Sequence, residues 1–140
     1  MLDSERILAK IDELDGYLSE LGEVAPASLA EYERIEKRRS CERLLQISIE
    51  SVVDVCGLIV AGLRLGLPGE EDDLLAKLVG AGVITHGMAE VLHSMKGLRN
   101  LLVHEYGRVD DRIVYAAVRT RLGDFAEFKR VILEFLRQTP

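Results

Sequence analysis

Residues 44–60 read LLQISIESVVDVCGLIV and are apolar on most sides of a helix. A helix that is apolar nearly all round is packed by several neighbours at once, so this stretch predicts the central helix of a bundle. It continues an amphipathic segment that begins near Ser28, and the combined helix is expected to end near Leu63, before the loop sequence GLPG at 66–69. The chain is thus organised around one long helix.

Amphipathic helices are predicted on both sides of this central one. The expected ranges are Ser4–Leu21 with Ser4 as N-cap, a short helix at Asp72–Val79, a helix capped by Thr85 that runs to His104, and a last helix from Asp110 or Asp111 to about Leu136. Their apolar stripes include Ile7, Leu8, Ile11, Leu14, Met88, Leu92, Met95, Leu98, Val114, Val118, Phe125, Phe128 and Ile132. The sequence therefore predicts an all-α protein, a four-helix up-and-down bundle with an additional short helix, in a single domain at 1–140.

The composition is that of a helical globular chain. It has 140 residues, 48% of them apolar and 30% charged, with 3 prolines and no tryptophan. These values exclude disordered and fibrous proteins, and the length is sufficient for a core without disulfides or metal ions. The net charge of −6 argues against a general polyanion binder, although residues 96–121 carry six Lys or Arg against three acids, so this stretch is +3 and the remainder −9.

Nothing in the sequence predicts export or a membrane span. The N-terminus MLDSE is acidic where a signal peptide is basic, and the most apolar stretch, Val52–Leu63, is shorter than the about 20 residues that a span needs. Cys41 and Cys56 fall on one predicted helix about 22 Å apart, which is too far for a disulfide. We expect a cytoplasmic protein with reduced thiols that does not bind membranes.

Three histidines, His86, His93 and His104, lie on the helix predicted to follow Thr85. They point within about 20° of one another but are separated by about 10 and 16 Å along the axis, whereas a helical metal site uses positions i and i+4. The sequence also has no glycine-rich phosphate loop, paired CxxC or nucleophile elbow. We therefore expect no metal or cofactor, and we interpret His86 and His93 as exposed polar side chains.

Arg99 falls on the apolar face of the same helix. A charge there requires a carboxylate partner, because an unpaired buried charge is costly, and Glu50 and Asp54 on the long helix are the candidates for this supporting role. His104 lies about 140° further round, and Asn100 is placed four residues before it to hydrogen-bond to its ring. The residues alone are equally consistent with an internal ion pair and a surface histidine near a helix end.

The segment Arg99-Asn100-x-x-x-His104-x-Tyr106 resembles the R-x4-H-x-Y signature of the HepT family, a branch of the HEPN-domain ribonucleases. The stretch Cys41–Asp54 is similar to the long helix of that family, and the resemblance extends from about residue 2 to about residue 136. It implies a HEPN-like fold and a symmetric homodimer in which the two motifs face a shared cleft.

The resemblance also implies the chemistry. RNA cleavage in the family is independent of metal ions, with His104 as general base or acid and Arg99 as the group that holds the phosphate. Asn100 would orient the histidine or contact the phosphate. The expected activity is that of an endoribonuclease toxin, an mRNA interferase, that leaves a 2′,3′-cyclic phosphate.

A partner protein is implied as well. HepT toxins pair with an MntA-type minimal nucleotidyltransferase antitoxin, which adds AMP units to the tyrosine of H-x-Y, here Tyr106. Each AMP would add charge and bulk beside Arg99 and His104 and so exclude RNA. From the residues alone, Tyr106 is equally a tyrosine at a helix end with its hydroxyl in water.

Two other classes of function remain open at this point. A non-catalytic helical adaptor that docks a nucleotidyltransferase is favoured by the acidic net charge and by Glu105, Asp110 and Asp111 near the motif. A ligand-binding four-helix bundle is less favoured, because the only inward polar groups expected are Arg99 and its candidate partners.

Overall fold

The computed structural model describes residues 2–67, 69–104 and 109–139, and every regular element in these ranges is an α-helix. The helices are α1 (Ser4–Val24), α2 (Leu29–Tyr32), α3 (Ile35–Gly62), α4 (Glu71–Gly80), α5 (His86–His104), α6 (Asp111–Thr120) and α7 (Leu122–Gln138). The predicted all-α class is confirmed. The prediction of a single domain at 1–140 stays a prediction.

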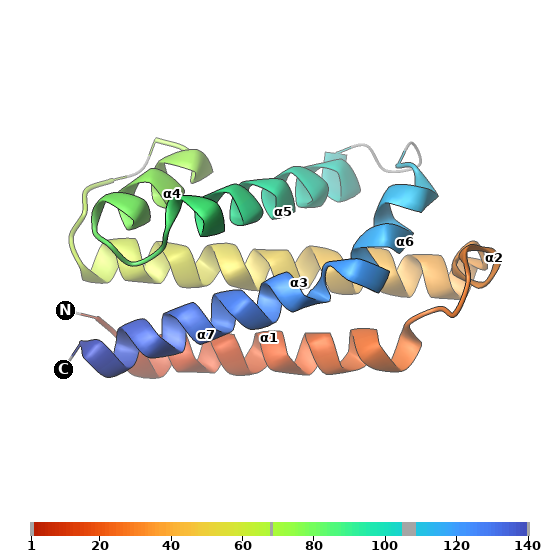
Figure 1. Ribbon diagram of the computed structural model, residues 1–140, viewed down its shortest axis with the longest axis horizontal. Coiled ribbons are helices and arrows are strands. Elements are labelled where there is room, and N and C mark those ends of the chain that lie inside the picture. Colours follow the sequence, from red (N-terminus) through yellow and green to blue (C-terminus); the bar gives the residue numbers. More distant parts are fainter. Residues whose placement is uncertain (1, 68, 105–108, 140) are drawn as a thin grey trace.

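The long helix α3 lies at the centre of the molecule. Figure 1 shows α4 and α5 along one side of it, with α1 and α7 along the other, and α1, α3, α5 and α7 alternate in direction. Buried side chains from α3 point toward these neighbours: Leu45, Ile49, Val52, Val55, Cys56, Ile59 and Val60. In this up-and-down arrangement, α4 lies within the connection from α3 to α5, and α6 lies within the connection from α5 to α7.

The predicted apolar stripes form most of the core. The fully buried side chains include Ile7 and Leu14 from α1, Leu92 from α5, and Phe128 and Ile132 from α7. Leu8 is an exception, because 46% of its surface is exposed. The N-cap of α1 also differs from the prediction: the side chain of Asp3, not that of Ser4, accepts a hydrogen bond of 3.1 Å from the backbone N–H of Arg6.

The helix predicted to begin at Ser28 is broken. Ser28 does cap a helix, since its Oγ accepts from the backbone N–H of Glu31 at 3.1 Å, but this helix is the single turn α2. Arg34 then has extended backbone, with φ −64° and ψ 134°, before α3 begins. The break places the buried Tyr32 against Tyr115 of α6, with ring centroids 6.0 Å apart. At this break, the chain forms the contact between Tyr32 and α6 in place of a continuous helix from α2 into α3.

The predicted last helix is also two helices. Arg121, with φ −113° and ψ 2°, separates α6 from α7, and its backbone N–H donates to the carbonyl of Ala117 at 2.9 Å. The change of direction lets α6 pack on α2 and α3 while α7 packs on α1 (Figure 1). One straight helix would reach only one of these two sets of neighbours.

By length and composition, α3 is a helix that could cross a membrane, with a mean hydropathy of 1.9 in its most apolar window. This differs from the expectation drawn from the shorter stretch Val52–Leu63. However, 56% of that window is buried inside the bundle, as in the core helix of other helical bundles. The two thiols on this helix, Cys41 and Cys56, are free, as predicted, and both are buried.

Candidate functional site

The candidate site is built on α5. This helix begins as predicted, because the Oγ1 of Thr85 accepts a hydrogen bond of 3.1 Å from the backbone N–H of Met88. The buried side chains of Leu92 and Met95 then fix the face that α5 turns toward α3 and α4. The polar residues of the motif follow in the last two turns of the helix, so their directions are set by this packing.

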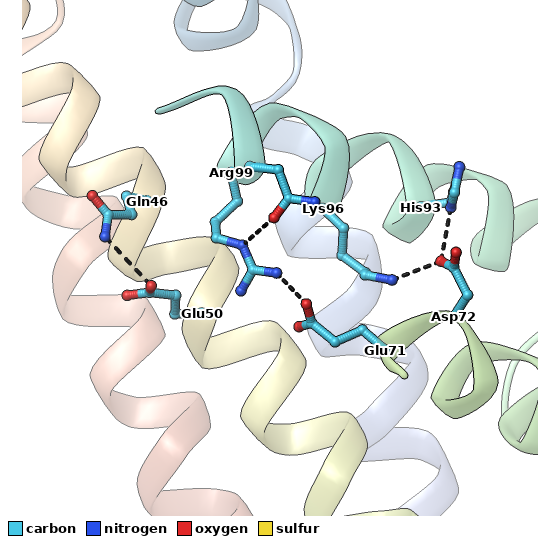
Figure 2. Close-up of polar contacts among 8 residues, drawn as sticks. Gln46, Glu50, Glu71, Asp72, His93, Lys96 and Arg99 are labelled. Carbon is cyan, nitrogen blue, oxygen red and sulfur yellow. Dashed lines mark hydrogen bonds and ion pairs between the residues drawn. The ribbon is translucent and has the colours of Figure 1, made fainter. Parts of the chain in front are cut away.

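Arg99 is held by a carboxylate from α4. Its side chain is only 14% exposed, and its Nη2 donates to Oε1 of Glu71 in the first turn of α4, while its Nε donates to Oδ1 of Asn100 at 3.1 Å (Figure 2). The need for a carboxylate partner is thus confirmed. Because the guanidinium is almost buried, this ion pair offsets a desolvation cost that a lone charge would carry.

The predicted partners of Arg99 are wrong. Glu50 accepts a hydrogen bond from Nε2 of Gln46 on its own helix at 3.4 Å, and Asp54 lies 3.3 Å from Nζ of Lys10 on α1. Both acids belong to α3, but Asp54 faces α1 rather than α5. Arg99 pairs instead with Glu71 in the acidic first turn of α4, and helical periodicity gives no information on which helix packs there.

Two further side chains of α5 contact the neighbouring carboxylate of α4. Nζ of Lys96, whose side chain is 9% exposed, donates to Oδ1 of Asp72 at 2.6 Å, and Nδ1 of His93 lies 3.0 Å from the same oxygen (Figure 2). The hydrogen bond from Lys96, followed by that with His93, lowers the pKa of Asp72. Lys96, Glu71 and Asp72 were not singled out from the sequence. The i, i+3 spacing of Lys96 and Arg99 places both side chains on one face of α5, and this was the signal that could have identified Lys96.

This pairing changes the expected charge of the site. Lys96 and Arg99 both count toward the net charge of +3 at 96–121, yet each is neutralised by an acid from outside that stretch. The structure therefore does not present them as an open basic patch. Any polyanion that binds here has to use specific donors rather than a broad positive field.

His104 is the last residue of α5, and its side chain is exposed. Five helical positions separate it from Arg99, which corresponds to about 140° of rotation and about 7.5 Å along the axis. Asn100 uses its amide oxygen for Arg99, and no hydrogen bond joins it to His104 in the described part of the chain. The structure thus brings Arg99 and Asn100 together but leaves His104 on another face. Tyr106 lies outside the described residues.

His86 and His93 are both exposed, as predicted. Within 2–67, 69–104 and 109–139, no group of three or more His, Cys, Asp or Glu side chains is placed to hold a metal ion. Beside α5, a groove of about 370 Å³ is lined mainly by apolar side chains, among them Leu98, Ile113 and Phe125. Its lining does not suit a phosphate, so the polar motif and the groove are separate features.

The sequence matches the family model described as Ribonuclease HepT-like over residues 7–132, which is most of the chain. The chain belongs to the HepT-like ribonuclease family. This HepT-like chain is 28% identical over 131 residues to the tRNA nuclease HepT of Aphanizomenon flos-aquae, covering 93% of this chain and 89% of the relative. It is 34% identical over 88 residues to the mRNA nuclease HepT of Shewanella oneidensis, covering 63% of this chain and 66% of that one.

A solved structure of the tri-AMPylated Shewanella oneidensis HEPN toxin in complex with MNT antitoxin superimposes with a TM-score of 0.86 at 28% identity. The match covers 96% of this HepT-like chain and 99% of the toxin chain. The resemblance drawn from the R-x4-H-x-Y motif is confirmed at the level of the family, and so is the HEPN fold. The roles of individual residues in this chain stay predictions.

Proposed function

We propose that this HepT-like protein is an endoribonuclease toxin, an mRNA interferase, that cleaves RNA without a metal ion. The observation that carries the proposal is the placement of Arg99 and His104 at the end of one helix, in the spacing of the family signature. The nuclease names of two relatives support the activity. The site of action that fits this activity is the cytoplasm, where RNA is the substrate.

The residues suit cleavage by the neighbouring 2′-hydroxyl. His104 takes the proton from that hydroxyl or returns one to the leaving 5′-oxygen, since imidazole side chains exchange protons near neutral pH. The 2′-oxygen attacks phosphorus and the bond to the 5′-oxygen breaks, which leaves a 2′,3′-cyclic phosphate and a 5′-hydroxyl. Arg99 stabilises the charge that builds on the non-bridging oxygens. Asn100 supports Arg99 through the hydrogen bond to its Nε.

A homodimer completes the site in this proposal. Arg99 and His104 diverge by about 140° on one helix, so the two side chains do not point toward a common phosphate. A two-fold contact brings the arginine of one subunit to the histidine of its partner. Exposed apolar side chains near this end of the molecule, Val103 at 40% and Ile113 at 50%, support a partner surface there.

Neutralisation by a cognate nucleotidyltransferase is the second part of the proposal. We infer that an MntA-type antitoxin transfers AMP to Tyr106, which follows His104 by two positions. The similar Shewanella oneidensis toxin, described as tri-AMPylated and in complex with MNT antitoxin, supports this inference. Added phosphate charges beside His104 would repel RNA and fill the space that it needs.

The nuclease proposal is tested with purified protein and labelled RNA in the presence of a chelator. We expect wild-type protein to leave 2′,3′-cyclic phosphate ends, and Arg99→Ala and His104→Ala each to lose at least about a hundredfold in rate. His86→Ala is the matched control, because it removes an exposed histidine from the other end of the same helix. Both tRNA and mRNA are offered, because the names of the two relatives differ in substrate. Full activity of His104→Ala would overturn the catalytic assignment.

The modification is tested by intact mass measurement after co-expression with an MntA-type nucleotidyltransferase. One or more AMP additions are expected on wild-type protein and on Tyr17→Phe, and none on Tyr106→Phe. The alternative function, a non-catalytic adaptor, is favoured by the acidic net charge and by the pairing of Arg99 with Glu71. A stable complex with the enzyme, with no RNA cleavage by wild-type protein, would select the adaptor.

A further inference from the structure

The contacts of Arg99 occupy one particular edge of its guanidinium. Nε donates to Asn100 and Nη2 donates to Glu71, and these two nitrogens form the side edge of the group. Figure 2 shows Nη1 directed away from both partners, and no partner for it occurs among the described residues. The end edge, made by Nη1 and the second proton of Nη2, therefore keeps the geometry for a bidentate contact with phosphate.

We propose that Glu71 is a positioning residue for RNA cleavage: with Asn100, it clamps the side edge of Arg99 so that the end edge meets the scissile phosphate. The proposal rests on the ribonuclease function proposed above and extends it to a residue outside the R-x4-H-x-Y motif. Glu71 acts through Arg99 and does not touch the substrate.

The clamp is separable from the packing of α4 on α5. The adjacent carboxylate of Asp72 holds Lys96 and His93, so the first turn of α4 stays attached to α5 without the contact between Glu71 and Arg99. The apolar residues of the same helix, Leu74, Leu75 and Leu78, are buried as well. The contact of Glu71 is therefore available to orient Arg99, because other residues hold α4 in place.

Orientation is valuable for this side chain in particular. Arginine has a large rotamer entropy, and a guanidinium that has to be fixed during the reaction adds this entropy loss to the activation barrier. A clamp present before RNA binds moves the cost into folding. Since transition-state contacts affect kcat and ground-state contacts affect KM, the loss of the clamp is expected mainly in kcat.

A Glu71 that blocked Arg99, rather than oriented it, would have the opposite effect on RNA cleavage. If Glu71 merely neutralised Arg99 and had to leave before phosphate could bind, its removal would raise the affinity for RNA and increase the rate. The burial of Arg99, at 14% exposed, favours the clamp, because displacing Glu71 would leave its carboxylate without this partner and the arginine without its only ion pair among the described residues. The two roles therefore predict opposite changes in the cleavage rate when Glu71 is removed.

The test compares Glu71→Ala, Glu71→Gln and Asp72→Ala in steady-state cleavage of one RNA substrate. We expect Glu71→Ala to lower kcat by about 10- to 100-fold with KM within about threefold, as for other residues that orient an active-site group. Glu71→Gln keeps an oxygen acceptor of the same shape and should recover to within about fivefold of wild type. Asp72→Ala is the matched control: it removes the neighbouring carboxylate and is expected to lower the melting temperature while kcat stays within about threefold.

A second readout reports the clamp directly. In ¹⁵N spectra, the Nε–H signal of Arg99, assigned by its loss in Arg99→Lys, should be sharp in wild type and Asp72→Ala but broadened in Glu71→Ala. Cleavage by wild type with kcat of Glu71→Ala unchanged or raised would overturn the positioning role alone. Absence of cleavage by wild type would overturn the proposed function, and the positioning role with it. Circular dichroism confirms that each variant is folded.

Discussion

Mixing two inactive variants tests whether Arg99 and His104 act across a two-fold axis. In a composite site, a heterodimer of Arg99→Ala and His104→Ala has one site with both residues intact and one with neither. Random exchange of subunits makes about half of all dimers heterodimers, each with half its sites working, so the mixture regains about a quarter of wild-type activity. The geometric reason is the divergence of about 140° between the two side chains on α5.

The assay is metal-free RNA cleavage after the two variants have been incubated together, with native mass spectrometry of tagged subunits to measure the fraction of heterodimer. A second mixture provides the control. Compared with the same total concentration of wild type, an equal mixture of wild type and the double variant has about a quarter of the activity if the site is shared, and about half if each chain carries its own site. Heterodimers without cleavage, together with half activity in the control, would refute the shared site.

Three further predictions concern stability and reactivity. The buried hydroxyl of Tyr32 has no hydrogen-bond partner among the described residues, so Tyr32→Phe should raise the free energy of unfolding in urea by about 1 kcal/mol; a decrease would contradict the orphaned hydroxyl. Because the pKa of Asp72 is lowered in the folded state, its contribution is present above the ordinary pKa of aspartate and lost as pH falls through the lowered value. The stability difference between wild type and Asp72→Asn should therefore be full at neutral pH and shrink as the pH falls below the ordinary pKa of aspartate, and a difference independent of pH would refute the pairing. Burial raises the pKa of Cys41, and that of Cys56 to about 12, so both thiols should react slowly with a disulfide reagent until the protein unfolds; rapid labelling of folded protein would contradict this.

Periodicity predicted the helices well, because one apolar stripe at helical spacing has few other ways to be buried. It failed where helices break. Tyr32-Glu33-Arg34-Ile35 contains neither glycine nor proline, and the break there comes from the packing of Tyr32 on Tyr115, eighty-three positions away in the sequence, whose ring centroid lies 6.0 Å from that of Tyr32. Arg121 is a similar case, since α6 and α7 pack on different neighbours. Such breaks are tertiary effects that local propensity does not encode.

The candidate site was likewise predicted only in part from the sequence. The phase of α5 predicted that Arg99 would be nearly buried and in need of a carboxylate, and both statements hold. The phase of α5 did not predict Glu71, because the partner of Arg99 depends on how α4 packs against α5. Non-helical residues join α4 to α3 and to α5, so the direction of its side chains cannot be extrapolated from either helix. The same is true of Lys96, which looked like part of a basic stretch and is instead held by Asp72.

The matched carboxylates of α4 and cations of α5 have a consequence for how the length of this chain can vary. One residue inserted in α5 between Lys96 and Arg99 would turn everything after it by about 100° and shift it by about 1.5 Å, which removes the guanidinium from Glu71 while Asp72 keeps its own partners. An insertion between α3 and α4 leaves both pairings in register. Related sequences are therefore expected to gain and lose residues in the connections, while this part of α5 changes by substitution only.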